Sequence, residues 1–155
     1  MLLSTADRLA IHELLNLHGH LCDVGAFDRF DEIMTADVTY DVSDLGGGVM
    51  HGVDECQAVA IALGSGNPVA HLVTNIVIGE ATTAGVDVAS KGLGVMGSGT
   101  IGSVVYLDRV IRTTHGWRIA RRRVIARRVP LSPYDLPVSP PRPVDGDETR
   151  RAERE

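Results

Sequence analysis

Four long segments that read as consecutive β-strands most constrain how this chain folds. They cover residues 69–81, 84–97, 101–112 and 116–129, they are rich in Val and Ile, and only short turns separate them. Connections this short join antiparallel neighbours, because a parallel pair needs a much longer crossover. The second half of the chain is therefore predicted to form an antiparallel meander.

The first half of the chain has helical periodicity instead. An apolar face predicts a helix over about 5–23 that stops near Gly25; its members are Ile11, Leu14, Leu15, His18 and Cys22. Further helices are expected over 27–34 and 53–63, with a strand at 37–44 between them. The prediction is an α+β fold in which a curved antiparallel or mixed sheet wraps around three helices.

Several predicted strands are apolar on both faces. In the segment 69–81, Leu72, Ile76 and Ile78 lie on one face, and Val73 and Val77 lie on the other. Such a sheet needs cover on both sides, and the three helices cover only one. The other face is expected to meet further copies of the chain, which predicts a homo-oligomer, either a dimer or a trimer.

Composition limits the partners and the location. The 155 residues suit one domain, and the net charge of −5 argues against nucleic-acid binding. No run approaches the ~18 apolar residues of a membrane span, and the N-terminus lacks the features of a signal peptide. Cys22 and Cys56 are too few for a disulfide framework, so a cytoplasmic location is expected.

The C-terminal part changes character at Pro130. It contains six prolines and ends in the charged sequence DGDETRRAERE. A segment like this cannot bury a core, so residues 130–155 are predicted to form a flexible tail after a folded domain at 1–129. An arm that wraps a neighbouring subunit or covers a pocket is the alternative.

The predicted end of the first helix carries an unusual set of titratable groups. His18 and Cys22 lie four residues apart on its apolar face, and Asp23 follows them. Zinc uses such ligands, but the sequence has no CxxC or HExxH motif, and we expect no metal. His18 and Cys22 are instead expected to line a substrate pocket between the helix and the mouth of the sheet.

Two tyrosines and an arginine are further candidates for substrate contacts. Tyr40 and Tyr106 lie in apolar strands, where each either packs in the core or polarises a substrate carbonyl. Strand alternation gives Arg123 the same parity as Trp117, and therefore predicts that Arg123 faces inward. It would then bind substrate or form a salt bridge, and a β-bulge would change this assignment. The possible acidic partners are Asp41, Asp108 and Glu80.

The order of several short motifs resembles a known family. The acid that ends the first helix is followed by F-D…DV-Y, by a histidine that opens a later strand, and by GWRIA-R. Over residues 4–129 the chain resembles the SnoaL-like branch of the nuclear-transport-factor-2-like superfamily. That resemblance implies a cone-shaped, cystatin-like α+β barrel that is usually oligomeric. Relatives include polyketide cyclases, scytalone dehydratase, hexachlorocyclohexane dehydrochlorinase and small subunits of ring-hydroxylating dioxygenases.

The resemblance also implies a catalytic pair. The dehydratase and dehydrochlorinase relatives use an Asp–His pair without a metal or cofactor, and the matching positions here are Asp23 and His71. A carboxylate beside an imidazole fixes its tautomer and raises its basicity, which suits a general base. The alternative is a solvated acid and an unrelated histidine.

The predicted function follows from this pair. It is a cofactor-independent cyclase, dehydratase or isomerase of secondary metabolism that acts on a small, apolar, carbonyl-bearing substrate. A non-catalytic ligand binder or a structural subunit of a larger oxygenase remains the alternative, because one fold supports many functions.

Overall fold

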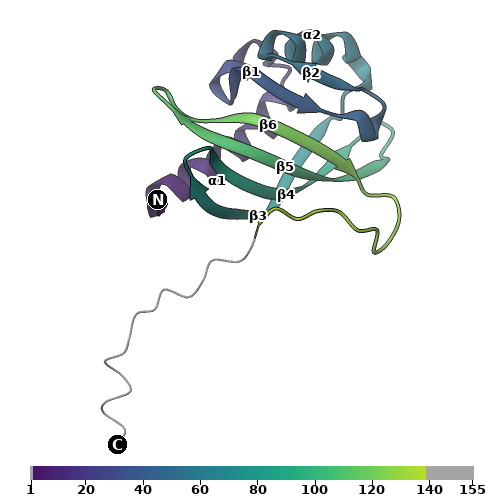
Figure 1. The fold of residues 1–155 in the computed structure, drawn as a ribbon. Coiled ribbons are helices and arrows are strands. Elements are labelled where there is room, and N and C mark those ends of the chain that lie inside the picture. The colour runs from purple at the N-terminus through teal and green to yellow at the C-terminus, as the bar shows by residue number, and fades with distance from the viewer. Residues whose placement is uncertain (1, 139–155) are drawn as a thin grey trace, which may run out of the picture.

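A computed structural model describes residues 2–138, which form one curved sheet with helices on its concave side (Figure 1). The helices are α1 (Thr5–Asp23) and α2 (Val53–Leu63), and the 3₁₀ turns are η1 (Phe27–Glu32), η2 (Ser43–Leu45) and η3 (Gly64–Gly66). The strands are β1 (Met34–Asp41), β2 (Val49–His51), β3 (Ala70–Thr82), β4 (Gly85–Val95), β5 (Ile101–Thr113) and β6 (Gly116–Ala126). Within residues 2–138, no helix is long and apolar enough to cross a membrane.

The strand order in the sheet is β2-β1-β6-β5-β4-β3. The pairs β3–β4, β4–β5 and β5–β6 are antiparallel, which confirms the predicted meander. The first strand of the chain also pairs with the last, because β1 and β6 are parallel neighbours in the sheet. The predicted α+β class and the curved, mixed sheet around the helices are confirmed, but the sheet does not close into a barrel.

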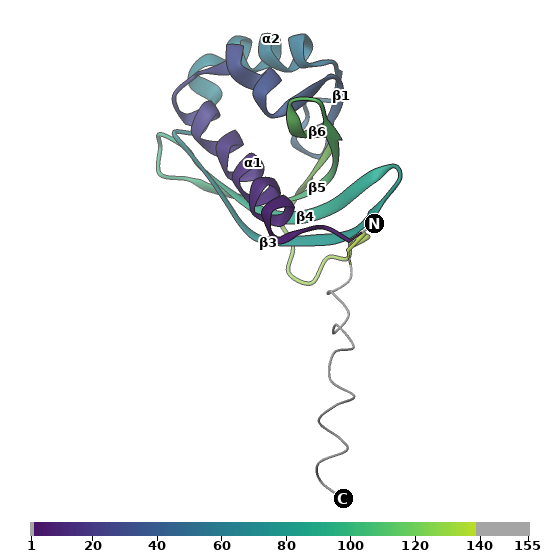
Figure 2. The same cartoon turned by 90° about the vertical axis from the view of Figure 1, so that its left-hand side faces the viewer.

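Helix α1 lies in the concave side of the sheet (Figure 2). Its start is fixed by a capping box, in which the Ser4 hydroxyl accepts the Asp7 N–H (3.1 Å) and the Asp7 carboxylate accepts the Ser4 N–H (3.2 Å). Its apolar face, with Ile11 and Leu15 fully buried, packs into the core. The sheet thereby holds the C-terminal end of α1 against the start of β3.

A β-bulge in β6 decides which arginine faces the core. Arg121 pairs with Arg109, but the next pair along β5 is Val110 with Ile119, so β6 contains one extra residue there. An extra residue reverses the side on which all following side chains lie. Arg122 is therefore fully buried, and Arg123 is exposed. The expectation that Arg123 faces inward is wrong for this reason.

Large apolar side chains remain exposed along β3, β4 and β5. They are Leu72, Val77, Leu93 and Ile101. Within β3, Leu72 comes from one of the two expected apolar faces and Val77 from the other, because the pairing with β4 shifts between Thr74 and Val77. The homo-oligomer stays a prediction.

The beginning of the expected tail contacts the sheet. Val138 is only 8 % exposed, and a Cβ added to Gly79 in β3 would lie 3.5 Å from the Val138 side chain. Arg127 also lies over the Tyr134 ring, with 5.0 Å between Cζ and the ring centroid. The expectation that nothing after residue 129 packs is therefore wrong at Val138. The rest of the predicted tail, 139–155, lies outside the described residues.

We predict that Val138→Ser lowers the free energy of unfolding by about 1–2 kcal/mol, because it removes a buried apolar side chain. Urea titration of the full chain measures this change. Leu136→Ser is the matched control and should leave stability nearly unchanged, since Leu136 is exposed. Equal effects of the two substitutions would show that Val138 contributes no specific packing.

Candidate active site

Helix α1 crosses the start of β3 at Gly19. A Cβ at this position would lie 2.6 Å from the backbone carbonyl oxygen of His71, which is closer than real contacts allow. Only glycine therefore lets the helix and the strand approach this closely. The backbone of β3 occupies the space that a side chain at position 19 would need.

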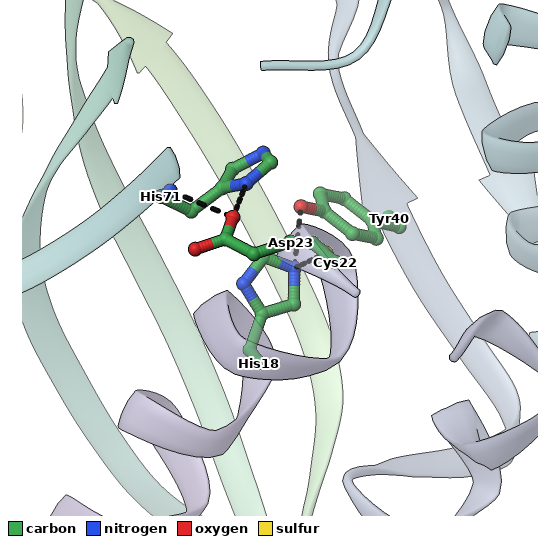
Figure 3. Close-up of polar contacts among 5 residues, drawn as sticks. All are labelled: His18, Cys22, Asp23, Tyr40 and His71. Atoms are coloured by element: carbon green, nitrogen blue, oxygen red, sulfur yellow. Dashed lines mark hydrogen bonds and ion pairs between the residues drawn. The ribbon is translucent and has the colours of Figure 1, made fainter. Parts of the chain in front are cut away.

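This close approach joins Asp23, the last residue of α1, to His71. The Oδ1 atom of Asp23 accepts a hydrogen bond from the His71 ring at Nδ1 (2.8 Å) and another from the His71 backbone N–H (2.9 Å) (Figure 3). Their side chains are 27 % and 14 % exposed, so the pair lies at the boundary between the interior and solvent. The predicted juxtaposition of Asp23 and His71 is present.

The two hydrogen bonds determine the chemistry of the imidazole. A carboxylate offers only acceptors, so the proton of neutral His71 lies on Nδ1 and the lone pair lies on Nε2. Because the same oxygen also binds the backbone N–H, the ring is held relative to its own strand. Nε2 of His71 makes no hydrogen bond within residues 2–138, so it can accept a proton beside a carboxylate that stabilises the resulting positive charge.

A second imidazole, that of His18, lies next to the His71 ring and is more deeply buried. The ring centroids of His18 and His71 are 6.2 Å apart. His18 Nε2 lies 3.4 Å from the Tyr40 hydroxyl and 3.7 Å from the Cys22 sulfur (Figure 3). His18 is buried, and its Nδ1 atom has no hydrogen-bond partner in residues 2–138. Burial, and then the nearby positive charge of Arg122, hold the pKa of His18 well below its usual value, so this ring is neutral.

The Cys22 thiol is unreactive. Burial raises the pKa of Cys22 to about 12, so the thiol keeps its proton near neutral pH. A protonated thiol is neither a nucleophile nor a metal ligand. Within the described part of the chain, no group of three or more His, Cys, Asp or Glu side chains is arranged to hold a metal ion.

A fully buried ion pair lies deeper in the sheet. Arg122 in β6 donates from Nε and Nη2 to the two carboxylate oxygens of Asp108 in β5, at 2.7 and 2.8 Å. Burial disfavours the Arg122 charge, but the Asp108 carboxylate more than offsets this effect and holds the pKa of Arg122 above its usual value. The remaining nitrogen, Nη1, has no hydrogen-bond partner among residues 2–138.

Both tyrosines contact this arginine. The Arg122 Cζ atom lies 4.4 Å from the Tyr106 ring centroid and 5.7 Å from that of Tyr40, which are cation–π distances. Tyr106 is also 6.1 Å from His18, ring to ring. Burial raises the pKa of Tyr40 and of Tyr106, so both hydroxyls stay protonated.

The structure therefore brings together all but one of the side chains expected at the site. The assembled residues are His18, Cys22, Asp23, Tyr40, His71 and Tyr106. Arg123 does not join them, and sequence analysis missed Arg122. The missing information was the bulge in β6, because a strand without it would turn Arg122 outward. Asp108 was among the expected partners of an inward arginine, and it has that role.

A groove of about 480 Å³ lies elsewhere, between α1, η1 and the start of β6. Its lining includes His20, Trp117 and Arg118, but neither Asp23 nor His71. The sequence placed its expected substrate pocket between the first helix and the mouth of the sheet. This groove is distinct from the Asp23–His71 pair.

Comparison with known proteins agrees with this architecture. The family model for the SnoaL-like domain matches residues 4–123. The chain therefore belongs to the SnoaL-like family, as the resemblance in its motifs predicted. No curated protein matches the chain significantly.

Solved structures share the fold at low sequence identity. A candidate scytalone dehydratase from Novosphingobium aromaticivorans is 16% identical, with 89% of this chain and 94% of that chain covered and a TM-score of 0.68. LinA is 19% identical, with 85% and 95% covered and a TM-score of 0.69. The beta subunit of a candidate aromatic-ring-hydroxylating dioxygenase from N. aromaticivorans is 16% identical, with 82% and 92% covered and a TM-score of 0.61. At these identities the likeness establishes the fold alone.

We predict that Gly19→Ala separates α1 from β3, because the new methyl group overlaps the His71 carbonyl. The free energy of unfolding should fall by about 1–3 kcal/mol, and the NMR signal of the hydrogen-bonded His71 Nδ1–H should disappear. Gly102→Ala is the control, since a Cβ there meets nothing within 4 Å. A retained Nδ1–H signal in Gly19→Ala would contradict the expected crossing.

A second prediction concerns the pH dependence of stability. His18 has a lowered pKa when folded, so below about pH 6.5 the unfolded chain binds the proton more readily than the folded protein. Its contribution is therefore fully present above that pH, and it is lost at up to about 1.4 kcal/mol per pH unit as the pH falls. Urea titrations across this range should show a shallower decline for His18→Phe than for the wild type. His20→Phe should show the wild-type decline.

Proposed function

We propose that this protein is a cofactor-independent enzyme of the lyase or isomerase type. It removes a proton from a carbon atom next to a carbonyl group in a small apolar substrate. Dehydration, cyclisation and isomerisation of natural-product-like intermediates all begin with this step. The observation that carries the proposal is the bond between Asp23 Oδ1 and His71 Nδ1, which leaves Nε2 of His71 free.

In this mechanism His71 is the general base and Asp23 is its positioning residue. Nε2 takes the proton from carbon, and the Asp23 carboxylate, 2.8 Å from Nδ1, stabilises the imidazolium that forms. A positioned base of this kind typically accelerates a reaction by about 10²–10⁴-fold. Membership of the SnoaL-like family is compatible with this chemistry, and the candidate scytalone dehydratase shares the fold.

The test is hydrogen exchange at a carbon acid. The probe is 2-tetralone, an apolar ketone with acidic protons next to its carbonyl, dissolved in D₂O and followed by proton NMR. The wild type should accelerate exchange, and His71→Gln and Asp23→Asn should each remove most of this acceleration, about 10²-fold or more for His71→Gln. Asn at position 23 fails because its amide stabilises the wrong tautomer and cannot stabilise the imidazolium.

The matched control is His115→Gln, an exposed histidine in the β5–β6 turn, which should exchange the ketone at the wild-type rate. Exchange at that rate in His71→Gln as well would remove the catalytic proposal. A non-catalytic ligand binder or oxygenase subunit, as in the dioxygenase beta subunit with the same fold, would then be the better explanation.

A further inference from the structure

The buried residues next to His71 form a chain of polar contacts that ends at an unpaired nitrogen of His18. Asp108 binds Arg122, the Arg122 guanidinium lies over the Tyr40 ring, and the Tyr40 hydroxyl lies 3.4 Å from His18 Nε2. The other ring nitrogen, His18 Nδ1, is buried and has no partner in residues 2–138. The proposed role of His71 does not use this nitrogen.

The neighbours of His18 favour one position for its proton. Nε2 faces the Tyr40 O–H and the Cys22 S–H, both of which are held protonated by burial. Both groups can donate to the ring only when the lone pair lies on Nε2 and the proton lies on Nδ1. In this tautomer the unpaired atom is an N–H donor on a neutral imidazole.

The charge of Arg122 strengthens this donor. Its positive charge opposes the effect of burial on the Tyr40 pKa, which makes the hydroxyl a better donor toward His18. Hydrogen bonds in such a chain polarise one another, so Nδ1–H becomes more acidic than in an isolated imidazole. The same charge also helps to keep His18 neutral.

We propose that His18 is a catalytic residue that donates its Nδ1–H to the carbonyl oxygen of the substrate while His71 removes the neighbouring proton. The inference rests on the proposed function and adds to it the group that stabilises the developing enolate. A neutral imidazole suits this purpose because it donates a hydrogen bond without transferring its own proton.

The step balances without another reactant. The C–H bond breaks, its proton moves to His71 Nε2, and its electron pair forms the C=C bond of the enolate. The carbonyl π pair moves onto the oxygen, which accepts the hydrogen bond from His18. The two rings are neighbours that meet edge to face, with 6.2 Å between their centroids, so in this step the substrate lies beside both rings and not between them.

The same contacts define the class of substrate. Both oxygens of Asp108 bind Arg122 and balance the charge of the one buried cation at the site, and Asp23 adds a carboxylate beside His71. A carboxylate or phosphate group of a substrate would meet no uncompensated positive charge among these residues. The site therefore favours a neutral ketone or enone whose negative charge appears only during the reaction.

The experiment uses 4-nitrophenol, whose phenolate oxygen resembles an enolate oxygen and whose visible absorbance reports its ionised form. We expect His18→Phe, which keeps a ring but removes both nitrogens, to weaken binding of the phenolate by roughly 10- to 100-fold. His20→Phe, the same change two residues later at an exposed position, should bind it like the wild type. Unchanged binding in His18→Phe would overturn the proposal.

A second measurement does not depend on His18→Phe folding. Nitrogen NMR of the wild type should show His18 as the neutral Nδ1–H tautomer at neutral pH, and its Nδ1–H signal should move when 4-nitrophenol is added. Tyr40→Phe removes the donor to Nε2 and should increase the share of the Nε2–H tautomer. A protonated Nε2 in the wild type, or an Nδ1–H signal that ignores the phenol, would overturn the proposal.

The two proposals fail in distinguishable ways. His18→Phe is also made in the His71→Gln protein, where general-base catalysis is absent. A loss of phenolate affinity that persists in this background supports the His18 donor even if the 2-tetralone exchange test removes the proposed function. If His18→Phe no longer weakens phenolate binding in the His71→Gln protein, the affinity depends on His71, and the role of His18 is overturned.

Discussion

The contact on which the site depends joins one carboxylate oxygen of Asp23 to two donors of His71. This oxygen binds both the backbone N–H and the ring of His71, so it ties the end of α1 to the start of β3 and orients the imidazole at once. The contact is possible because Gly19 lets the helix backbone approach the strand. The packing of α1 on β3 therefore also sets the position of the His71 imidazole. A change in how the helix and the strand cross would move this ring.

The second constraint is the buried pair of Arg122 and Asp108. An arginine with no exposed surface is tolerated because its fork matches the carboxylate in a bidentate geometry. The pair leaves Arg122 Nη1 without a partner among residues 2–138 and places a positive charge beside Tyr40, Tyr106 and His18. Burial, together with this charge, keeps the His18 imidazole neutral, while the Asp23 carboxylate holds and orients the His71 imidazole. Two histidine rings whose centroids lie 6.2 Å apart thus have different surroundings.

Much of the fold was predictable because its signals are local. The helix at 5–23, the helix at 53–63 and the four-stranded meander follow from hydrophobic periodicity and short connections, which depend only on neighbouring residues. The parallel pairing of β1 with β6 and the packing of Val138 were not predicted, because both join segments that are far apart in the chain. The segment after residue 129 is polar and rich in proline, and this composition does not predict that Val138 is buried.

The sequence by itself determined the class of site: an acid at the end of one helix, a histidine at the start of one strand, and the resemblance that pairs Asp23 with His71. Only the tertiary structure decided which arginine joins them, because one extra residue in β6 turns Arg122 inward and Arg123 outward. A bulge is specified by how two strands pair rather than by a periodic pattern, so alternation along β6 alone selects the wrong residue. The unpaired Nδ1 of His18 is likewise a product of the tertiary structure, since burial leaves it without a partner in residues 2–138 and keeps the ring neutral.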